Sequence, residues 1–368
     1  MKASTVQMLS NTALSSSSLL IPNLARDQFG ATTGEIGVIV ASYSAAIFIS
    51  SYVFGRFSDV YGRRSILVAG LILSALACFL QVFAFNTITL EITRIVLGLC
   101  AGIFPSALLA YVYESDKKIG KFSSYGSLGF GIGTFMAGVI GVYYGIFLFS
   151  ALVMFIAYMV SLYLPFGKEV HHAVPFFPVN VIKRNFPIYL SVMFRHTGAS
   201  MIWVIYPLFL ADLGADPIFI GAIYAVNAVA QFVFMQFTDK YGSYLLIIVG
   251  FIMSILTFPS YTLATIYWEI IPAQIMIALA WSTLYVGSVK YVMERNDEKG
   301  TSAGLLQSAL SISSIIGALL GGVAAEAYGY HGCMYIATVV AIIGLVIFLF
   351  SHRWASRHFD KDFRPTSQ

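Results

Sequence analysis

The sequence predicts an all-α membrane protein of twelve transmembrane helices, arranged as two pseudo-symmetric six-helix halves. Three observations lead to this prediction. The chain is 58% hydrophobic and only 10% charged, whereas a soluble domain carries roughly 25% charged residues. Its apolar segments are each close to the roughly 20 residues that a helix needs to cross a bilayer. A charged motif in the first half recurs at a fixed offset in the second half.

The predicted spans cover residues 4–24, 36–55, 65–85, 89–111, 122–144, 146–165, 186–211, 218–238, 244–265, 268–290, 302–325 and 332–350. They divide the chain into an N-terminal half (1–167), a cytoplasmic central linker (168–185), a C-terminal half (186–350) and a cytoplasmic tail (351–368). Such short connections exclude a separate catalytic or nucleic-acid-binding domain.

The most specific motif follows the second predicted span. It reads G-x-x-x-D-x-x-G-R-R and consists of Gly55, Asp59, Gly62, Arg63 and Arg64. This pattern resembles the signature loop of the major facilitator superfamily, in which the loop is a gate element. The alternative interpretation is an ordinary basic loop that only sets topology.

The motif recurs in the second half. Asp239 and Gly242 repeat its aspartate and second glycine 180 positions later (239 minus 59). The same offset relates Glu114 to Glu294, which are predicted to end the fourth and tenth helices. In the second copy, Ser243 replaces the first arginine of the motif. Internal repeats of this kind are typical of transporter folds, with the ligand site between the repeats.

The first loop has a physical interpretation of its own. A carboxylate at the end of the second helix is well placed to cap the positive N-terminus of a neighbouring helix. The family resemblance implies that Asp59 caps the eleventh helix, near residues 300–302. It also implies that Arg63 pairs with Glu114.

The resemblance implies a mirrored arrangement in the second half. Asp239 would cap the fifth helix near residues 121–123. Lys240 or Arg295 would be available to Glu294. Because the second loop lacks the arginines, we expect it to be the weaker of the two locks.

Lysine and arginine residues set the predicted orientation. With the Arg63 loop inside, almost all of them outside the spans fall on the cytoplasmic side, and Arg26 alone falls on the other. The sequence thus predicts a multi-pass protein of the plasma membrane with both termini cytoplasmic. The net charge of +4 reflects this topology, and the scattered basic residues without aromatic platforms argue against a nucleic-acid partner.

Arg94 is a charged residue inside the fourth span. It shares one helix face with Gly98 and Gly102, a spacing that resembles the helix-4 motif of the superfamily, whose arginine is linked to proton coupling in many members. An arginine at a helix centre costs about 2.5 to 3.5 kcal/mol on insertion scales. A structural alternative is an ion pair with Glu91, three residues earlier on the same face.

The seventh span carries Arg195 and His196. Counted from Pro187 at ~1.5 Å per residue, Arg195 lies roughly 12 Å into the membrane, too deep to reach the surface comfortably. We therefore expect it to face a central cavity, where Arg94 and Arg195 would suit an anionic or zwitterionic substrate. Histidine has an unperturbed pKa of about 6.5, which makes His196 a candidate coupling group, although a buried histidine also serves as an ordinary hydrogen-bonding residue.

Amide side chains mark other cavity positions. Asn11, Asn227, Gln231 and Gln307 lie on polar helical stripes, and unsatisfied polar groups are costly in hydrocarbon. The neighbouring serines are weaker candidates because they also mediate helix packing. In the fifth helix, six glycines resemble the glycine-rich helix of family antiporters but lack the Gly-Pro pair of those proteins, and we expect them to pack against a helix of the other half.

These patterns predict a secondary active transporter that moves a small organic solute by alternating access, in the form of a proton-coupled exporter of amphipathic compounds. The alternatives are an importer or exchanger of organic anions or sugars, and a membrane sensor or scaffold that does not transport. No nucleophile and base pair, metal-ligand cluster or phosphate loop indicates an enzyme, a cofactor or a metal. The expected partners are the substrate, protons and the lipid bilayer, and the expected state is a monomer.

Overall fold

The protein is described by a computed structural model that covers residues 2–31, 33–115, 117–166, 175–215 and 217–358. Residues 167–174, which contain the first part of the predicted central linker, lie outside this description. Residues 359–368 of the predicted tail also lie outside it. The described chain is helical with short connections, as the composition predicts.

The N-terminal half is built from α1 (Lys2–Leu19), α2 (Ile21–Phe29), α3 (Thr33–Tyr61), α4 (Arg63–Leu80), η1 (Gln81–Phe83), α5 (Thr87–Ala101), α6 (Phe104–Ser115), α7 (Ile119–Ile140) and α8 (Tyr143–Ser161). The first predicted span corresponds to α1 with α2, and the fourth to α5 with α6. Asn86 starts α5 by a reciprocal cap: its side chain accepts from the Thr89 amide at 2.8 Å, and the Thr89 hydroxyl accepts from the Asn86 amide at 3.0 Å.

The C-terminal half is built from α9 (Val179–Asp212), α10 (Pro217–Met235), η2 (Thr238–Lys240), α11 (Ser243–Ser260), η3 (Tyr261–Leu263), η4 (Tyr267–Ile270), α12 (Ile271–Glu294) and α13 (Lys299–His358). The long α13 contains the eleventh and twelfth predicted spans. They are separated at Gly329, whose φ of 70° and ψ of 178° are not helical. Because α9 begins at Val179, the seventh helix extends into the region predicted as linker, and the division at 168–185 stays a prediction.

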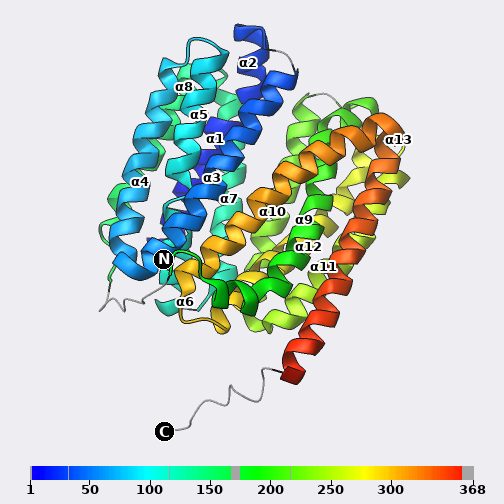
Figure 1. Ribbon diagram of the computed structural model, residues 1–368. Helices are drawn as coiled ribbons and strands as arrows, with labels where there is room; N and C mark the ends of the chain where they lie inside the picture. Colours follow the sequence, from blue (N-terminus) through cyan, green and yellow to red (C-terminus); the bar gives the residue numbers. More distant parts are fainter. Residues whose placement is uncertain (1, 32, 116, 167–174, 216, 359–368) are drawn as a thin grey trace.

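Figure 1 shows the two halves side by side. They meet along two seams, one between α3 and α13 and the other between α7 and α10. The halves converge at the end that carries the loops 55–64 and 235–244, which we call the motif end. At the opposite end they stand further apart, so the contacts that hold the halves together concentrate at the motif end.

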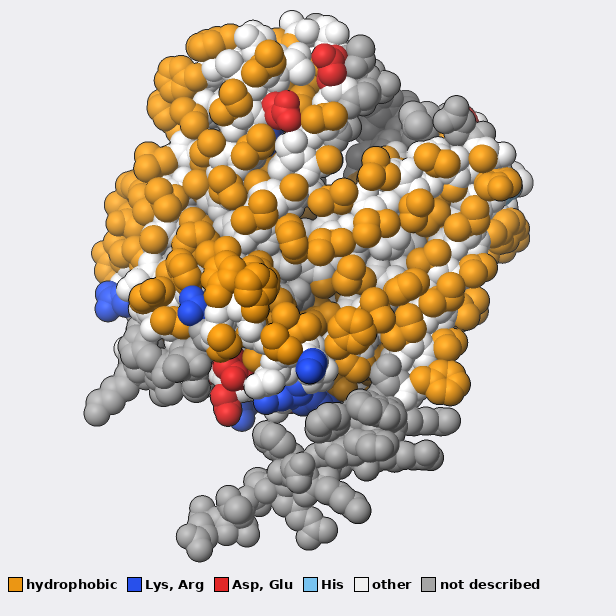
Figure 2. Space-filling view, in the orientation of Figure 1, with side chains coloured by type: hydrophobic (Ala, Val, Ile, Leu, Met, Phe, Trp, Pro, Cys, Tyr) orange, Lys and Arg blue, Asp and Glu red, His pale blue; other side chains and the backbone are white. Residues whose placement is uncertain are grey.

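The surface has the distribution expected of a membrane protein. Apolar side chains cover the middle of the face in Figure 2, and charged side chains gather at its two ends. Eight of the described helical segments are long and apolar enough to cross a membrane by length and composition. Large apolar side chains such as Leu152 and Leu319 are exposed on these helices, which is favourable only where lipid covers them.

The glycines of α7 correct one expectation. Gly129 and Gly133 face α1 of the same half, where an added Cβ would collide with the Met8 and Thr12 carbonyls. Thr12 Oγ donates to the Gly129 carbonyl at 3.1 Å across this contact. Only part of the glycine surface faces the other half, at Gly131 beside Ala228 of α10. The prediction that the glycine face packs against the other half was therefore largely wrong, because α7 uses its smallest face to approach α1.

Candidate functional site

Asp59 joins the two halves at the motif end. Its side chain is 1% exposed in α3 and accepts from the backbone amides of Gly300 at 3.0 Å and Thr301 at 2.7 Å. The Thr301 hydroxyl donates a third hydrogen bond at 2.7 Å. These amides begin α13 and have no partner within their own helix. Asp59 thus caps α13, as the family resemblance implied.

Arg63 extends this contact along the motif end. Its Nη2 lies 2.7 Å from Glu114 Oε1 and 3.3 Å from Asp59 Oδ1. The preceding Gly62 has a φ of 96°, a conformation that glycine adopts without steric cost. Arg64, next along the chain, lies over the Phe166 ring at 5.9 Å. The motif thus supplies a cap, a bridge and the turn that positions them.

Gly55 permits the close approach of α3 and α13. A Cβ at this position would lie 2.8 Å from both the Gly300 carbonyl oxygen and the Gly304 Cα. Both atoms belong to the backbone and cannot rotate away. A side chain at residue 55 would therefore push the two helices apart and lengthen the Asp59 hydrogen bonds.

The second loop repeats the cap at the predicted offset. Asp239 accepts from the amides of Gly120 at 2.7 Å and Lys121 at 2.9 Å, at the start of α7. Positions 120 and 121 lie 180 residues before the two amides that Asp59 binds (300 minus 120, 301 minus 121). By contrast, Gly242 has an ordinary φ of −66° and open space where a side chain would lie. The backbone cap is thus repeated, whereas the steric need for a glycine is not.

The partner of Glu294 differs from the one expected. Ser243 Oγ donates to Glu294 Oε2 at 2.6 Å, at the position where Arg63 meets Glu114 in the first half. Arg295 instead lies over the Tyr291 ring at 3.8 Å, and Lys240 lies over the Phe237 ring at 5.6 Å. The pairing of Glu294 with Lys240 or Arg295 is therefore replaced by a hydrogen bond from an uncharged donor.

Sequence reasoning missed Lys290. This residue of α12 is 9% exposed, and its ammonium donates to the backbone carbonyls of Tyr241 at 2.6 Å and Asp239 at 3.3 Å. It thereby holds the second loop from a different helix. A lysine at the end of a predicted span was the available signal, but such residues commonly extend to the membrane surface instead.

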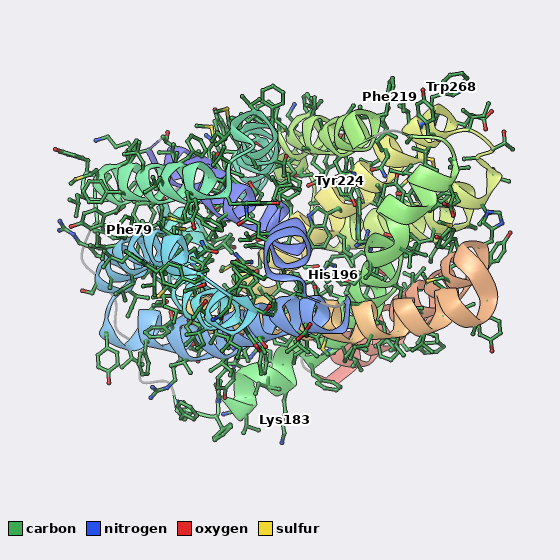
Figure 3. All side chains as sticks on the ribbon, turned by 90° about the horizontal axis from the view of Figure 1, so that it is seen from above. Phe79, Lys183, His196, Phe219, Tyr224 and Trp268 are labelled. Carbon is green, nitrogen blue, oxygen red and sulfur yellow. The ribbon has the colours of Figure 1, made fainter. Side chains whose placement is uncertain are left out.

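A central cavity of about 670 Å³ lies between the halves. Six of the seven candidate substrate and coupling residues line it, namely Asn11, Arg195, His196, Asn227, Gln231 and Gln307. Seen along the bundle, His196 and Tyr224 lie near the middle of the molecule, whereas Trp268 lies at its rim (Figure 3). The Asp59 and Asp239 contacts close the motif end, and Figure 2 shows the surface hollowed between the halves at the other end.

Arg195 is the charged residue of this cavity. Its side chain is 2% exposed, and its Nε donates to Ser254 Oγ at 2.7 Å. The guanidinium lies 5.5 Å from the Trp281 ring and 5.6 Å from the Phe258 ring. Its Nη2 is buried without a hydrogen-bond partner among the described residues. A buried donor of this kind is costly unless another group binds it.

His196 lies beside Arg195 on α9. Its Nε2 lies 3.2 Å from Ser314 Oγ, and its ring is 5.1 Å from the Trp281 ring. Its Nδ1 is buried without a hydrogen-bond partner in the described part of the chain. Two unpartnered nitrogen atoms thus come from consecutive residues that line one cavity.

Amide side chains connect the cavity to the seam between the halves. Ser127 of α7 donates to Gln231 Oε1 at 3.0 Å, and Gln231 Nε2 donates to Asn227 Oδ1 at 2.6 Å. Asn227 in turn donates to the Gln274 carbonyl at 3.3 Å. A solute that bound Gln231 would compete with a hydrogen bond between the halves.

Arg94 lies away from the cavity wall. It donates to Gln81 Oε1 at 3.3 Å and Ser18 Oγ at 3.1 Å, and it lies 4.0 Å from the centre of the Tyr43 ring. Glu91 instead accepts from Ser42 at 2.9 Å. The ion pair with Glu91 is thus replaced by neutral partners, and in this conformation Arg94 stabilises the packing of the N-terminal half.

The cavity wall carries positive charge and no carboxylate among the described residues that line it. In the described residues, no group of three or more His, Cys, Asp or Glu side chains could hold a metal ion, and the three cysteines are free. The binding chemistry of the cavity is therefore that of one guanidinium, one imidazole, several amides and aromatic rings.

The family model of the Major Facilitator Superfamily matches residues 3–183 and again residues 188–368. The chain belongs to the Major Facilitator Superfamily. It is therefore a multi-pass membrane protein of a transporter family and not an enzyme. The two matches correspond to the two repeats in which the signature loops lie.

Similar proteins agree with this assignment. An uncharacterized MFS-type transporter of Methanocaldococcus jannaschii is 26% identical over 349 residues, which cover 87% of this chain and 90% of the relative. The quinolone resistance protein NorA of Staphylococcus aureus is 24% identical over 356 residues, with 90% of each chain covered. The crystal structure of the human organic anion transporter MFSD10 superposes with a TM-score of 0.80 at 12% identity, covering 94% of this chain and 98% of the other. This likeness supports the fold.

Proposed function

We propose that this transporter moves a small organic anion or zwitterion with an aromatic or apolar body, by alternating access of the central cavity to the two sides of the membrane. The observation that carries the proposal is that Arg195, whose buried Nη2 has no partner among the described residues, lines a cavity whose described wall has no carboxylate. An anionic group on the solute would supply both the missing acceptor and the missing counter-charge.

Aromatic side chains provide a surface for the body of such a solute. Trp203, Tyr224, Trp281 and Tyr285 line the cavity. Trp281 and Tyr285 are stacked with ring centres 5.3 Å apart. Flat apolar groups gain both burial and ring contact on such a wall. The cavity therefore favours aromatic anions over sugars, which need more hydrogen bonds.

The proposed cycle uses the motif end as the cytoplasmic gate. With the loops on the cytoplasmic side of the plasma membrane, the Asp59 and Asp239 caps hold an outward-facing state. Release of both caps would open the cavity toward the cytoplasm, where both termini would also lie. We keep the monomer as the proposed transporting unit, because each chain supplies both halves of the cavity.

A second candidate is proton-coupled export of amphipathic compounds, and the likeness to a quinolone resistance protein favours it. The cavity's titratable group for such coupling is His196, whose Nδ1 has no hydrogen-bond partner among the described residues. This candidate requires that protonation of His196 and solute binding be linked. The two candidates differ in coupling and direction, and they share the same cavity.

Transport by the full chain in proteoliposomes tests the proposal. The probes are an aromatic carboxylate, its neutral amide and an aromatic ammonium of similar size. We expect the carboxylate to be preferred, and Arg195→Lys to raise its KM about tenfold, because a hydrogen bond to a charged group contributes about 1.5 to 3 kcal/mol and lysine loses the planar fork.

Arg94→Lys is the matched control, since Arg94 is also buried but lies outside the cavity wall. It should lower stability without changing the preference for the carboxylate. Equal transport of all three probes, or a preference for the ammonium, would contradict the proposed substrate class. A pH gradient that drives transport in the wild type but not in His196→Gln would favour the proton-coupled candidate.

A further inference from the structure

A second cavity, of about 320 Å³, lies at the motif end of the N-terminal half. Its wall comes from the start of α1, the end of α6, the start of α7 and the chain that follows α8. It shares no lining residue with the central cavity. The proposed transport cycle assigns it no role.

Three lysines line this second cavity: Lys2, Lys118 and Lys121. No carboxylate belongs to the described residues that line it. Lys2 donates to the Tyr163 carbonyl at 3.2 Å, which leaves its charge uncompensated by that contact. Like charges that share one cavity repel each other, and an anion among them removes this repulsion.

The surrounding side chains form a frame for a bound group. Tyr111 donates to the Pro165 carbonyl at 3.3 Å, and its ring lies 4.7 Å from the Phe166 ring. Arg64 lies over the second ring of this pair, 5.9 Å from the Phe166 ring centre. Another cation is thus held close to the cavity by stacking, on the side where the signature loop lies.

We propose that this cavity binds a phosphate group, carried either by a soluble phosphorylated compound or by a phospholipid headgroup. Lysine binds phosphate as a point charge with rotatable donors, and basic pockets between transmembrane helices suit anionic headgroups. Phosphate is favoured over a carboxylate because several ammonium groups can share its oxygen atoms.

The site has a structural link to the gate. Lys121 lines the second cavity, and its backbone amide donates to Asp239 at 2.9 Å. A phosphate held by Lys118 and Lys121 therefore stabilises the start of α7 in the position at which Asp239 caps this helix. A ligand that prefers one conformation shifts the population toward it. The bound phosphate group favours the state that is closed at the motif end.

Thermal unfolding of the purified full chain tests the site. The probes are inorganic phosphate at constant ionic strength in lipid-free detergent, and phosphatidylglycerol against phosphatidylcholine in nanodiscs. The variant is K118Q/K121Q. The matched control is K117Q/K183Q, which removes the same charge from two lysines that are equally exposed but lie outside the cavity. Lys183 lies at the rim of the molecule in Figure 3.

We expect one of the probes to raise the unfolding midpoint saturably by several degrees in the wild type and the control, and not in K118Q/K121Q. A response to phosphate in detergent identifies a soluble ligand, and a response to phosphatidylglycerol alone identifies a headgroup. An equal response in all three proteins, or no response to either probe, overturns the site. Should the double variant be poorly folded before any probe is added, Lys2→Gln replaces it, with a smaller midpoint shift than the wild type as the expected result.

Discussion

The two signature loops share one geometry and differ in how it is secured. In each, an aspartate caps a helix of the other half through two consecutive backbone amides. The first cap is fully buried, gains a threonine hydroxyl and is bridged by Arg63 to Glu114. The second is partly exposed and is held by Lys290 from a separate helix.

This difference shows which part of a repeated gate is tolerant of sequence change. The amides at a helix start are present whatever the side chains are, so a cap needs only one carboxylate in place. The bridge needs a particular cation and a particular acid. A duplicated unit can therefore keep the cap in both copies and lose the ion pair from one of them. In the second copy a different residue, Lys290, then holds the loop.

The largest effect is expected for Asp59→Asn. This change keeps the shape but removes the charge that three donors share, and hydrogen bonds to a charged group contribute about 1.5 to 3 kcal/mol. The population of the state that is closed at the motif end should fall about tenfold or more relative to the open state. Transport should fall to a similar extent. Reactivity of a cysteine placed at Ser127, measured from the cytoplasmic side in a cysteine-free background, reports the change.

Asp239→Asn is the matched comparison for this variant, and we expect a smaller increase in reactivity because Asp239 has fewer donors and more solvent. An equal or larger effect at Asp239 would contradict the difference in strength between the two loops.

The next effect concerns the contact of the helices themselves. Gly55→Ala places a Cβ against the backbone of α13, and overpacking of this kind costs typically about 1 to 3 kcal/mol. The closed state should be weakened, with an increase in Ser127-cysteine reactivity. Gly242→Ala is the control, since that position has open space and an ordinary φ. Wild-type behaviour of Gly55→Ala would show that α3 and α13 separate easily.

A smaller effect is expected for Lys290→Met. It leaves the carbonyls of Asp239 and Tyr241 without their buried donor, at a cost of about 1 to 3 kcal/mol that water entering the loop would partly offset. Transport should fall several-fold, and Lys290→Arg should restore most of it by supplying a cation at the same place. If Lys290→Met leaves the protease sensitivity of the second loop unchanged, Lys290 does not position that loop.

The smallest effect is expected for Ser243→Arg, which places an arginine at the position equivalent to Arg63. An exposed ion pair with Glu294 contributes about 0.2 to 1 kcal/mol, so the closed population should rise only a few-fold. The rise should disappear in Ser243→Arg combined with Glu294→Gln. A gain that survives Glu294→Gln would show that the new arginine acts through another partner.

Much of this architecture follows from local sequence. Span length and apolar composition determine where helices cross the membrane, because each helix satisfies its own backbone hydrogen bonds. The offset of 180 residues also related the two loops and their partners correctly, since duplicated units keep the same internal contacts. These properties depend on residues close in sequence or on a repeat that can be counted along the chain.

The tertiary structure alone decided how the buried charges are used. Arg94 and Arg195 are both single arginines within predicted spans, yet only Arg195 lines the cavity, because the rotation of each helix depends on its neighbours. Lys290 and Glu294 likewise both contact the second loop from α12, about fifty residues further along the chain. Hydrogen bonds between helices depend on packing angles and side-chain directions in three dimensions, and no periodicity along one helix encodes them.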